Sequence, residues 1–192
     1  MARSTPVKPE LRRDAIARRD AIPAAELARI AAQLTASLEA LPQFKAARSV
    51  LATMSIGSEW STRAFIEGAR AAGKTVVLPR ISAPPRHLEL HAVPDLESDL
   101  VPGVWSIPEP DPARCPRVAL DQVDFALVPA LAVDRKGYRL GYGAGYFDKL
   151  LSGRGARPFC VTALPAQFVV DELPREDHDV AVDLVLAEQA RP

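Results

Sequence analysis

The chain has 192 residues, of which 48% are hydrophobic and 25% are charged, and these proportions exclude a disordered or collagen-like chain. Lysine and arginine total 24, and aspartate and glutamate also total 24, so the formal net charge is zero. This balance disfavours a protein that binds nucleic acid chiefly through phosphate contacts. The length suits one domain, and we expect residues 1–192 to form a single unit.

Neither the cysteines nor the apolar segments indicate an extracellular or membrane protein. Cys115 and Cys160 lie far apart in the sequence, which indicates neither a disulfide framework nor a cysteine-rich zinc site. The longest apolar run, residues 125–133, is interrupted by Pro129 and is far shorter than the roughly 20 residues of a membrane-spanning helix. We therefore expect a cytoplasmic protein with no membrane partner.

The hydrophobic pattern predicts helices and strands that alternate along most of the chain. In chain order, the predicted elements are helices 9–22 and 24–41, strand 48–56, helix 62–72, strands 74–81, 87–93 and 123–134, helix 145–151, and strands 158–164 and 180–186. Strand, helix and strand follow one another between residues 48 and 81, an order that favours a parallel pair with a helical crossover. The fold class is therefore α/β, with a mostly parallel sheet flanked by helices.

The middle of the chain is irregular. Nine of the 18 prolines lie between Pro79 and Pro116, and because proline donates no backbone hydrogen bond, this stretch predicts loops and edge strands. Residues 123–134 form the most apolar segment and should be a central strand, with a kink or bulge at Pro129.

Residues 139–148, with the sequence RLGYGAGYFD, follow that apolar segment and contain the main chemical signal. Gly141, Gly143 and Gly145 permit positive φ and allow backbone N–H groups to approach a ligand, and the next helix points its positive end toward the same place. Arg139 adds a cation for phosphate oxygens, and Asp148 adds a carboxylate where magnesium needs an oxygen ligand. The segment therefore predicts a phosphate cradle. An ordinary turn is the alternative, because turns also gather glycine and the loop matches neither the Walker nor the dinucleotide pattern.

With the strand before it, this loop forms the run LVPALAVDRKGYRLGYGAGYFDKLL, residues 127–151, which resembles the signature of the 5-formyltetrahydrofolate cyclo-ligase family, also called methenyltetrahydrofolate synthetase. Other parts of that pattern follow the family's order along nearly the whole chain. They are Lys8 with Leu11 and Arg12, Met54 to Glu59 and Thr62, Leu78-Pro79-Arg80, Trp105 before Ile107-Pro108-Glu109-Pro110, and His178-Asp179 with Asp183.

The resemblance implies a fold similar to the sugar-phosphate isomerase and CoA-transferase group. It also implies ATP- and magnesium-dependent conversion of 5-formyltetrahydrofolate to 5,10-methenyltetrahydrofolate. In the family's mechanism, the formyl oxygen takes the γ-phosphoryl group of ATP, the nitrogen at position 10 closes the ring, and phosphate leaves. No protein nucleophile is needed, and the sequence contains no recognisable Ser-His-Asp or Cys-His arrangement.

The resemblance assigns three groups of site residues. It places ATP on Lys8, Arg12, Arg139, Leu140, Gly141, Tyr142, Gly143, Ala144, Gly145, Tyr146 and Phe147. It places the folate on Met54, Glu59, Trp105, Tyr142, Gly143, Ala144, Gly145 and Tyr146, with Trp105 stacked on the pterin ring. It places magnesium on Asp148 and Asp179.

Several of these residues also have a purely structural interpretation. Lys8 and Arg12 lie one helical turn apart and could form a solvated face, and Glu59 could favour the dipole of the following helix. Asp179 could cap a turn, and Trp105 could anchor its proline-rich loop to the core. Elsewhere, His87, Glu89 and His91 share one strand face and look like a metal trio, but exposed polarity is the favoured interpretation.

Two positions depart from the family pattern. Phe147 stands where the family usually has a second tyrosine, so a hydroxyl group is lost while the ring is kept. Ala144 stands where some members have a basic residue, so one possible phosphate contact is absent. Neither departure argues for a loss of activity.

Two alternative functions come from different classes. The first is a sugar-phosphate isomerase or CoA-transferase on the same type of fold, for which Glu59 is the candidate base or nucleophile. The second is a non-catalytic nucleotide- or RNA-binding module that uses basic residues near the N-terminus, namely Lys8, Arg12, Arg13, Arg18 and Arg19. The balanced charge and the few aromatic residues disfavour this module, so we expect no nucleic-acid partner. We also expect a monomer.

Overall fold

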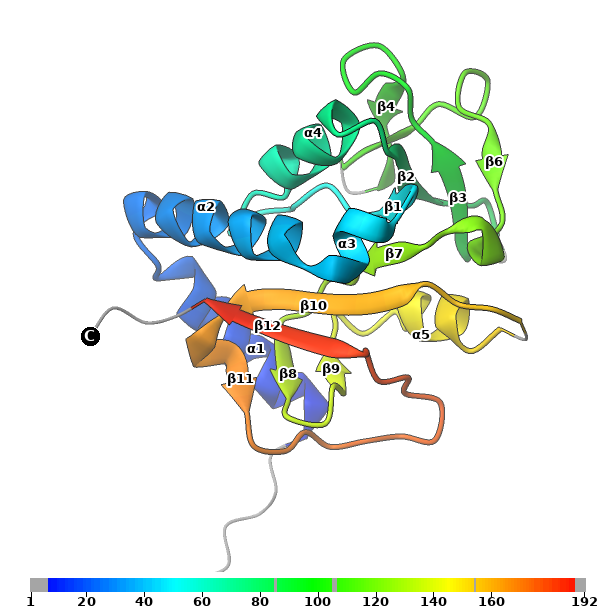
Figure 1. The fold of residues 1–192 in the computed structure, drawn as a ribbon. Helices are drawn as coiled ribbons and strands as arrows, with labels where there is room; N and C mark the ends of the chain where they lie inside the picture. The colour runs from blue at the N-terminus through cyan, green and yellow to red at the C-terminus, as the bar shows by residue number, and fades with distance from the viewer. Residues whose placement is uncertain (1–6, 85, 105–106, 154, 189–192) are drawn as a thin grey trace, which may run out of the picture.

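A seven-stranded sheet forms the centre of the computed structural model, which describes residues 7–84, 86–104, 107–153 and 155–188 (Figure 1). Its strands lie in the order β12 (Leu184–Glu188), β10 (Phe159–Pro165), β7 (Phe125–Leu127), β1 (Ser49–Leu51), β2 (Thr75–Ile81), β3 (Leu88–Ala92) and β6 (Arg117–Val118). The strands from β12 to β2 are parallel, and β3 and β6 extend the sheet in antiparallel pairing. The predicted parallel pairing of β1 with β2 is confirmed.

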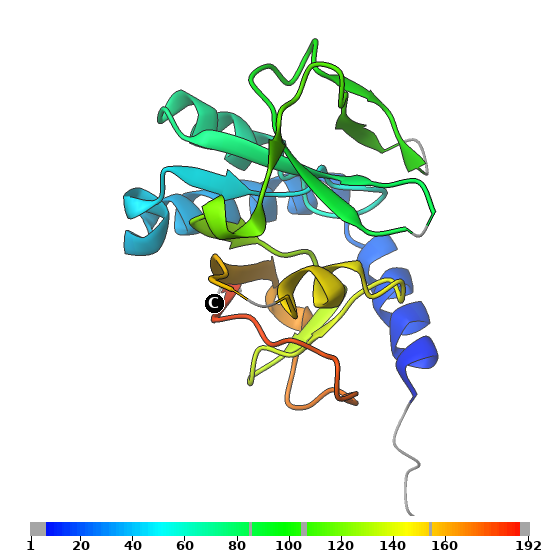
Figure 2. The same ribbon diagram turned by 90° about the vertical axis from the view of Figure 1, so that its right-hand side faces the viewer.

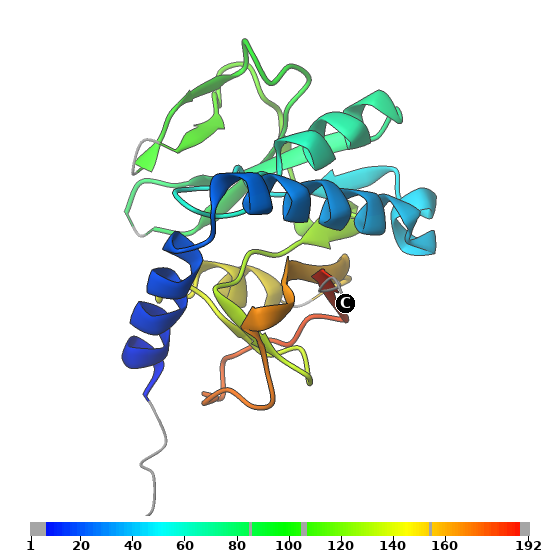
Figure 3. The ribbon, with the colours of Figure 1, turned by 90° about the vertical axis from the view of Figure 1, so that its left-hand side faces the viewer.

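Helices cover both faces of the parallel strands, which explains why these strands are apolar at successive positions. Three helices cover one face: α2 (Ala24–Ala40), α3 (Pro42–Ala46) and α4 (Arg63–Ala71) (Figure 3). Phe44 and Phe65 pack there against Phe125 of β7. The opposite face is covered by α5 (Tyr146–Leu151) (Figure 2). Leu151 of this helix belongs to the same buried cluster as Leu51 of β1.

The apolar segment 123–134 does not form the single central strand that the sequence predicted. It divides into β7 of the large sheet and β8 (Ala132–Asp134) of a second sheet, in which β8 lies between β11 (Val169–Val170) and β9 (Arg139–Leu140). Pro129 lies in the connection, so the missing donor ends the strand rather than only bending it. The change of sheet carries the chain to the glycine-rich loop.

The second sheet also holds the N-terminal helix α1 (Lys8–Asp20). Ala15 of α1 is buried with apolar residues of this sheet and its connections, among them Leu131 and Leu140. Because α1 packs there, residues from the beginning of the chain lie beside residues near its end (Figure 1).

The proline-rich middle forms loops and short edge strands, as predicted. A two-stranded antiparallel sheet is made by β4 (Leu100–Pro102) and β5 (Pro108–Pro110). Single 3-10 turns, η2 (Leu120–Gln122) and η3 (Ala166–Phe168), precede β7 and β11.

The predicted helices agree with the structure to within two residues at each end, whereas some strands are shorter than expected. Residues 48–56 supply only β1, and residues 180–186 overlap only the first part of β12. The prediction that one face of strand 87–93 is exposed and polar is wrong at His91, which is 4% exposed because β6 and the preceding segment cover it.

The parallel strands point their carboxyl ends toward one region, where ligands bind in many open α/β sheets. Thr53 and Met54 follow β1, and Pro129 follows β7, at this edge. None of the helices in the described ranges is long and apolar enough to cross a membrane.

Candidate active site

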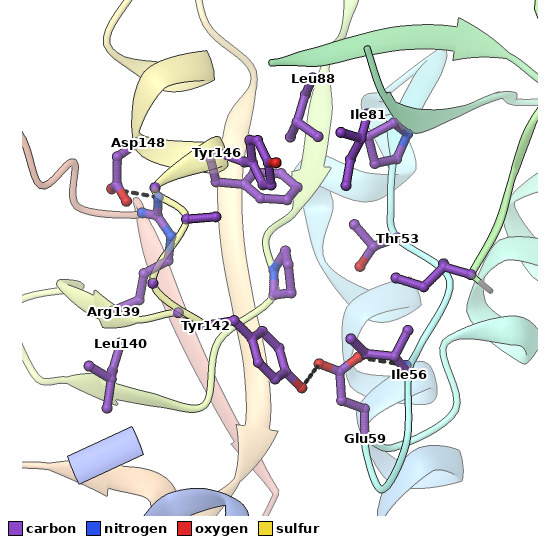
Figure 4. A pocket seen from close by; sticks show the side chains of 18 of the residues that line it. Thr53, Ile56, Glu59, Ile81, Leu88, Arg139, Leu140, Tyr142, Tyr146 and Asp148 are labelled. Atoms are coloured by element: carbon purple, nitrogen blue, oxygen red, sulfur yellow. Dashed lines mark hydrogen bonds and ion pairs between the residues drawn. The ribbon is translucent and has the colours of Figure 1, made fainter. Parts of the chain in front are cut away.

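A cavity of about 270 Å³ opens at this edge of the large sheet (Figure 4). It gathers every predicted site residue that the structure describes. These residues are Lys8, Arg12, Met54, Glu59, Arg139, Leu140, Gly141, Tyr142, Gly143, Ala144, Gly145, Tyr146, Phe147, Asp148 and Asp179. Trp105 lies outside the described residues, so its predicted contact with the pterin remains a prediction.

Two walls of different character face one another across the cavity. The charged wall consists of Lys8, Arg12, Arg139, Asp148, Glu176 and Asp179, and the apolar wall of Leu78, Pro79, Ile81, Leu88, Ile107 and Pro108. Figure 4 shows Arg139 and Asp148 on one side and Ile81 and Leu88 across from them. The cavity can therefore hold a charged group and a flat apolar group together.

The glycine-rich loop follows β9 and leads into α5. Gly143 has φ 107° and Gly145 has φ 65°, so the predicted positive φ is found at these two glycines, whereas Gly141 does not adopt it. Gly145 directly precedes the first turn of α5, whose residues Tyr146, Phe147 and Asp148 line the cavity.

Lys8 joins the start of α1 to the segment before β12. Its ammonium group donates to Asp179 Oδ2 at 2.8 Å and to Glu176 Oε1 at 3.0 Å. Burial by itself would lower the pKa of Lys8, but these two carboxylates outweigh it and raise that pKa. Burial likewise opposes the shift at Asp179, where the hydrogen bonds from Lys8 and from the Glu176 N–H lower the pKa of the carboxyl group.

Arg139 is almost fully buried, with its side chain 3% exposed. One guanidinium nitrogen donates to Asp148 Oδ1 at 2.8 Å, and another donates to the carbonyl oxygen of Val180. Burial lowers the pKa of Arg139, and the charge of Asp148 partly offsets that effect. Arg139 therefore fixes Asp148 and the glycine-rich loop, a structural role that the sequence did not indicate.

Arg12 differs from the other two cations of the charged wall. Its Nε donates to the carbonyl oxygen of Gly141 at 2.9 Å, and its guanidinium group lies under Gly143. Within the described residues, Arg12 forms no ion pair with a carboxylate, whereas Lys8 and Arg139 both do. Its terminal nitrogens remain available to an anionic ligand.

Tyr142 connects the glycine-rich loop to the loop after β1. Its hydroxyl group donates to Glu59 Oε1 at 2.7 Å (Figure 4). The same hydroxyl group accepts a hydrogen bond from Arg19 at 2.7 Å. Burial, together with the charge of Glu59, raises the pKa of Tyr142 to about 12. The second oxygen of Glu59 accepts the N–H of Ile56 at 3.0 Å.

Asp148 and Asp179 provide oxygen atoms that suit magnesium. Asp148 Oδ1 accepts from Arg139 and from the Val180 N–H, and Asp179 Oδ2 accepts from Lys8 and from the Glu176 N–H. The other oxygen of each carboxylate accepts no hydrogen bond from the described residues. Across the same residues, no three His, Cys, Asp or Glu side chains form a closed metal site. Two carboxylates fit magnesium, which usually keeps several water ligands and takes few from the protein.

The sequence matches the model of the 5-formyltetrahydrofolate cyclo-ligase family over residues 4–188. The chain belongs to this family. The family member from Mycolicibacterium smegmatis is 36% identical over 141 residues, which are 72% of this chain and 73% of that protein. The member from Mus musculus is 27% identical over 178 residues, or 88% of each chain.

Solved structures agree with this assignment. The NMR structure of the Aquifex aeolicus 5,10-methenyltetrahydrofolate synthetase has a TM-score of 0.83 and 30% identity, and the match covers 95% of this chain and 90% of that one. The Mycoplasma pneumoniae 5,10-methenyltetrahydrofolate synthetase has a TM-score of 0.74 at 19% identity, which supports the fold alone. The predicted α/β fold, the family resemblance and the prediction of a cyclo-ligase enzyme are confirmed.

The contacts of Glu59 disfavour the first alternative function, an isomerase or CoA-transferase. A general base or nucleophile needs a carboxylate oxygen that is free to attack or to take a proton, but both oxygens of Glu59 already accept hydrogen bonds. Arg19 lies 3.6 Å from the same carboxylate.

The RNA-binding alternative relied on exposed basic residues of α1. Lys8, Arg12 and Arg19 face the cavity or its rim and are engaged there, and Arg18 donates to the carbonyl oxygen of Gln167 at 2.8 Å. These contacts do not favour a continuous basic surface for a nucleic acid.

The suggested metal trio of strand β3 is not a metal site in the described structure. His91 is buried, and its Nδ1 lies 2.9 Å from the carbonyl oxygen of Cys115. Glu89 forms an ion pair with Arg117 at 3.3 Å, and its carboxylate oxygens lie 3.5 Å from His87 Nε2 and 3.9 Å from His91 Nε2.

Some residues at the site carry no distinctive signal in the sequence because their types are ordinary. The sequence indicates Arg19 only as part of a basic surface, and it does not indicate Glu176. The apolar wall carries no chemical signature in its sequence. The family pattern included Leu78, Pro79, Ile107 and Pro108, but it assigned them no role.

The positive φ of Gly143 gives a stability test of the loop. A Cβ atom at this position would lie 3.3 Å from the Arg12 guanidinium carbon, at a φ that side chains rarely adopt. We expect Gly143→Ala to lower the free energy of unfolding by about 3 kcal/mol. Gly145→Ala, at φ 65° and with no heavy atom within 4 Å, should cost only about 1 kcal/mol. Urea unfolding of both variants measures the difference, and equal losses would contradict the greater strain predicted at Gly143.

Proposed function

We propose that this chain converts 5-formyltetrahydrofolate to 5,10-methenyltetrahydrofolate and couples the reaction to ATP hydrolysis to ADP and phosphate, with magnesium. The observation that carries the proposal is the single cavity in which a charged wall faces an apolar wall. The reaction needs a nucleotide phosphate and a folate ring in contact, and the two walls have the matching chemistry. Membership of the family supports the same conclusion.

The proposed reaction requires positioning rather than a protein nucleophile. The oxygen of the N5-formyl group attacks the γ-phosphorus of ATP, and the bond between this phosphorus and the ADP oxygen breaks. N10 then attacks the activated formyl carbon and loses its proton, and the carbon–oxygen bond breaks as phosphate leaves. The protein must hold the two substrates in line and stabilise the phosphoryl charge.

The charged wall would bind the phosphate groups of the nucleotide. Arg12 offers terminal guanidinium nitrogens, which can form two parallel hydrogen bonds with phosphate oxygens. Lys8 has three ammonium donors and uses contacts to two carboxylates, so one donor remains for a phosphate. Residues 139–147, which include the glycine-rich loop, add backbone N–H groups.

Asp148 and Asp179 would hold the magnesium ion. Bound there with the nucleotide, the ion would neutralise phosphate charge. The surrounding residues prepare the two carboxylates for this role: Arg139 and the Val180 N–H orient Asp148, and Lys8 orients Asp179. Each carboxylate then keeps one oxygen atom that accepts no hydrogen bond from the described residues.

The apolar wall and the loop after β1 would hold the folate. Met54, Tyr146 and the apolar wall offer surface for the pterin ring, while residues 142–146 lie where the two substrates meet. Glu59 would keep Tyr142 in place, because the two side chains share a hydrogen bond. Trp105 is proposed to stack on the ring.

We also propose an oligomeric state and a cellular compartment for the enzyme. One chain supplies both walls of the cavity, which supports a monomeric enzyme. The two cysteines are buried and unpaired, which supports a reducing, cytoplasmic environment.

An absorbance assay tests the proposed function directly. The protein is incubated with 5-formyltetrahydrofolate, with and without ATP and with and without magnesium. We expect the absorbance of the methenyl product to appear only when both are present. Product formation without ATP, or none under any of these conditions, would contradict the proposal.

Arg12→Ala tests the phosphate role of α1. Because a hydrogen bond to a charged group is lost, we expect the affinity for ATP to fall about 10- to 100-fold while the affinity for the folate stays unchanged. Arg13→Ala, at the exposed neighbouring position, is the matched control. Calorimetry measures the affinities for both ligands. An unchanged affinity for ATP would mean that Arg12 has only a structural role.

Asp148→Asn separates the magnesium role of this residue from its structural role. Asparagine keeps an oxygen for the Val180 N–H and Arg139 but loses the charge, so turnover should fall by about 100-fold or more at fixed magnesium. The free energy of unfolding should fall by only about 1 kcal/mol, because Arg139 keeps this hydrogen bond although it loses its counter-charge. Asp148→Ala should instead lower the free energy of unfolding by about 3 kcal/mol, because it leaves the buried Arg139 unpaired. Asp177→Asn, in the same loop as Asp179, serves as the control. Wild-type turnover of Asp148→Asn would exclude the magnesium role.

A further inference from the structure

Glu109, in strand β5, is a buried acidic residue on the cavity wall that the proposed reaction has not yet used. Its side chain is 5% exposed and lines the cavity beside Pro108. An ionised carboxylate is costly to bury unless it forms an ion pair or hydrogen bonds, so the contacts of Glu109 bear on its function.

The described residues satisfy Glu109 only in part. Arg80 is its ion-pair partner, and the closest nitrogen lies 3.8 Å from Glu109 Oε2, which is too far for a hydrogen bond. The same nitrogen of Arg80 donates to the carbonyl oxygen of Pro110 at 3.0 Å. None of the hydrogen bonds among the described residues ends on either carboxylate oxygen of Glu109.

The fold makes room for this carboxylate. Glu109 pairs with Val101 across the β4–β5 sheet, and its side chain lies over Gly103. A Cβ atom at Gly103 would lie 2.2 Å from the Glu109 carboxyl carbon, so no larger residue fits there without displacing the side chain. The glycine and the short sheet together hold a charged group where an apolar residue would be less costly.

The surroundings of Glu109 exclude the charged wall as its partner. Arg80 lies in β2 between Pro79 and Ile81 of the apolar wall, and Figure 4 shows Ile81 across the cavity from Asp148. A cation is not the expected ligand, because the Arg80 guanidinium group already supplies positive charge there. The missing partner is therefore a neutral group with N–H donors inside a flat, largely apolar ligand.

We propose that the Glu109 carboxylate binds the donor edge of the pterin ring by accepting hydrogen bonds from N3–H and from the 2-amino group. These two donors lie side by side on one edge of the ring, and a carboxylate accepts two such donors with its two oxygens. The positive charge of Arg80, 3.8 Å from Glu109 Oε2, partly offsets the cost of burying the carboxylate. This inference rests on the proposed function, since it names the residue that would recognise the folate ring.

Calorimetry without ATP turnover tests the inference. Folate binding is measured with 5-formyltetrahydrofolate and with its analogue that lacks the 2-amino group, and nucleotide binding is measured with ATP and magnesium. The variants are Glu109→Gln, which has the same shape but places an amide group against one of the two donors, and Glu109→Asp, which keeps the charge. Glu67→Gln, in an exposed ion pair on α4, is the matched control.

We expect Glu109→Gln to weaken 5-formyltetrahydrofolate binding about 10- to 100-fold and to leave ATP binding and the thermal midpoint unchanged. The wild type should bind the 2-deamino analogue less tightly than the natural folate, and Glu109→Gln should discriminate less between the two. Glu109→Asp should recover part of the lost affinity.

Three outcomes would overturn the inference. Unchanged folate affinity in Glu109→Gln would exclude a direct contact with the folate. A loss of ATP affinity alone would indicate that the carboxylate binds the ribose of the nucleotide instead. An equal loss for the natural folate and the 2-deamino analogue would mean that Glu109 acts on the shape of the wall. If the wild-type protein bound no folate at all, the proposed function itself would fail, which is a different result from any of these three.

Discussion

The buried ion pair between Arg139 and Asp148 is the interaction on which the rest of the site depends. Arg139 is 3% exposed, so its charge requires the carboxylate and the Val180 carbonyl oxygen as partners. These contacts join the first residue of β9, the first turn of α5 and the segment before β12. The glycine-rich loop lies between the two members of the pair, so both of its ends are fixed while its backbone stays free to approach a ligand.

A second group of contacts joins the two ends of the chain. Lys8 in α1 binds Asp179, 171 positions away, and Arg19 in the last turn of α1 binds Tyr142 of the glycine-rich loop. Because α1 packs on the small sheet, its position depends on the chain leaving the large sheet at Pro129. One proline therefore influences the site at a distance, by sending β8 and β9 to the sheet that carries α1.

The sequence predicted local features well and tertiary ones less well. The helices, the parallel pairing of β1 with β2 and the positive φ of two glycines follow from periodicity and glycine spacing, which act over a few residues. The division of segment 123–134 between two sheets depends on which sheet can pair with each half, and that is set by distant strands. The buried states of His91 and Arg139 were missed for the same reason, since the segments that cover them lie far away in the sequence.

The charge balance of the charged wall bears on how the two ligands of the proposed reaction would arrive. Its described members are three cations, Lys8, Arg12 and Arg139, and three carboxylates, Asp148, Glu176 and Asp179. A free nucleotide would meet the carboxylates, and a free magnesium ion would meet the cations, so each alone is partly repelled. In a magnesium–nucleotide complex, the metal would face the carboxylates and the phosphates would face the cations. Arg12 can bind a phosphate without breaking an ion pair, because it forms none with the described residues. The ion pairs that organise the ligand-free wall therefore also favour the metal and the nucleotide together over either one alone.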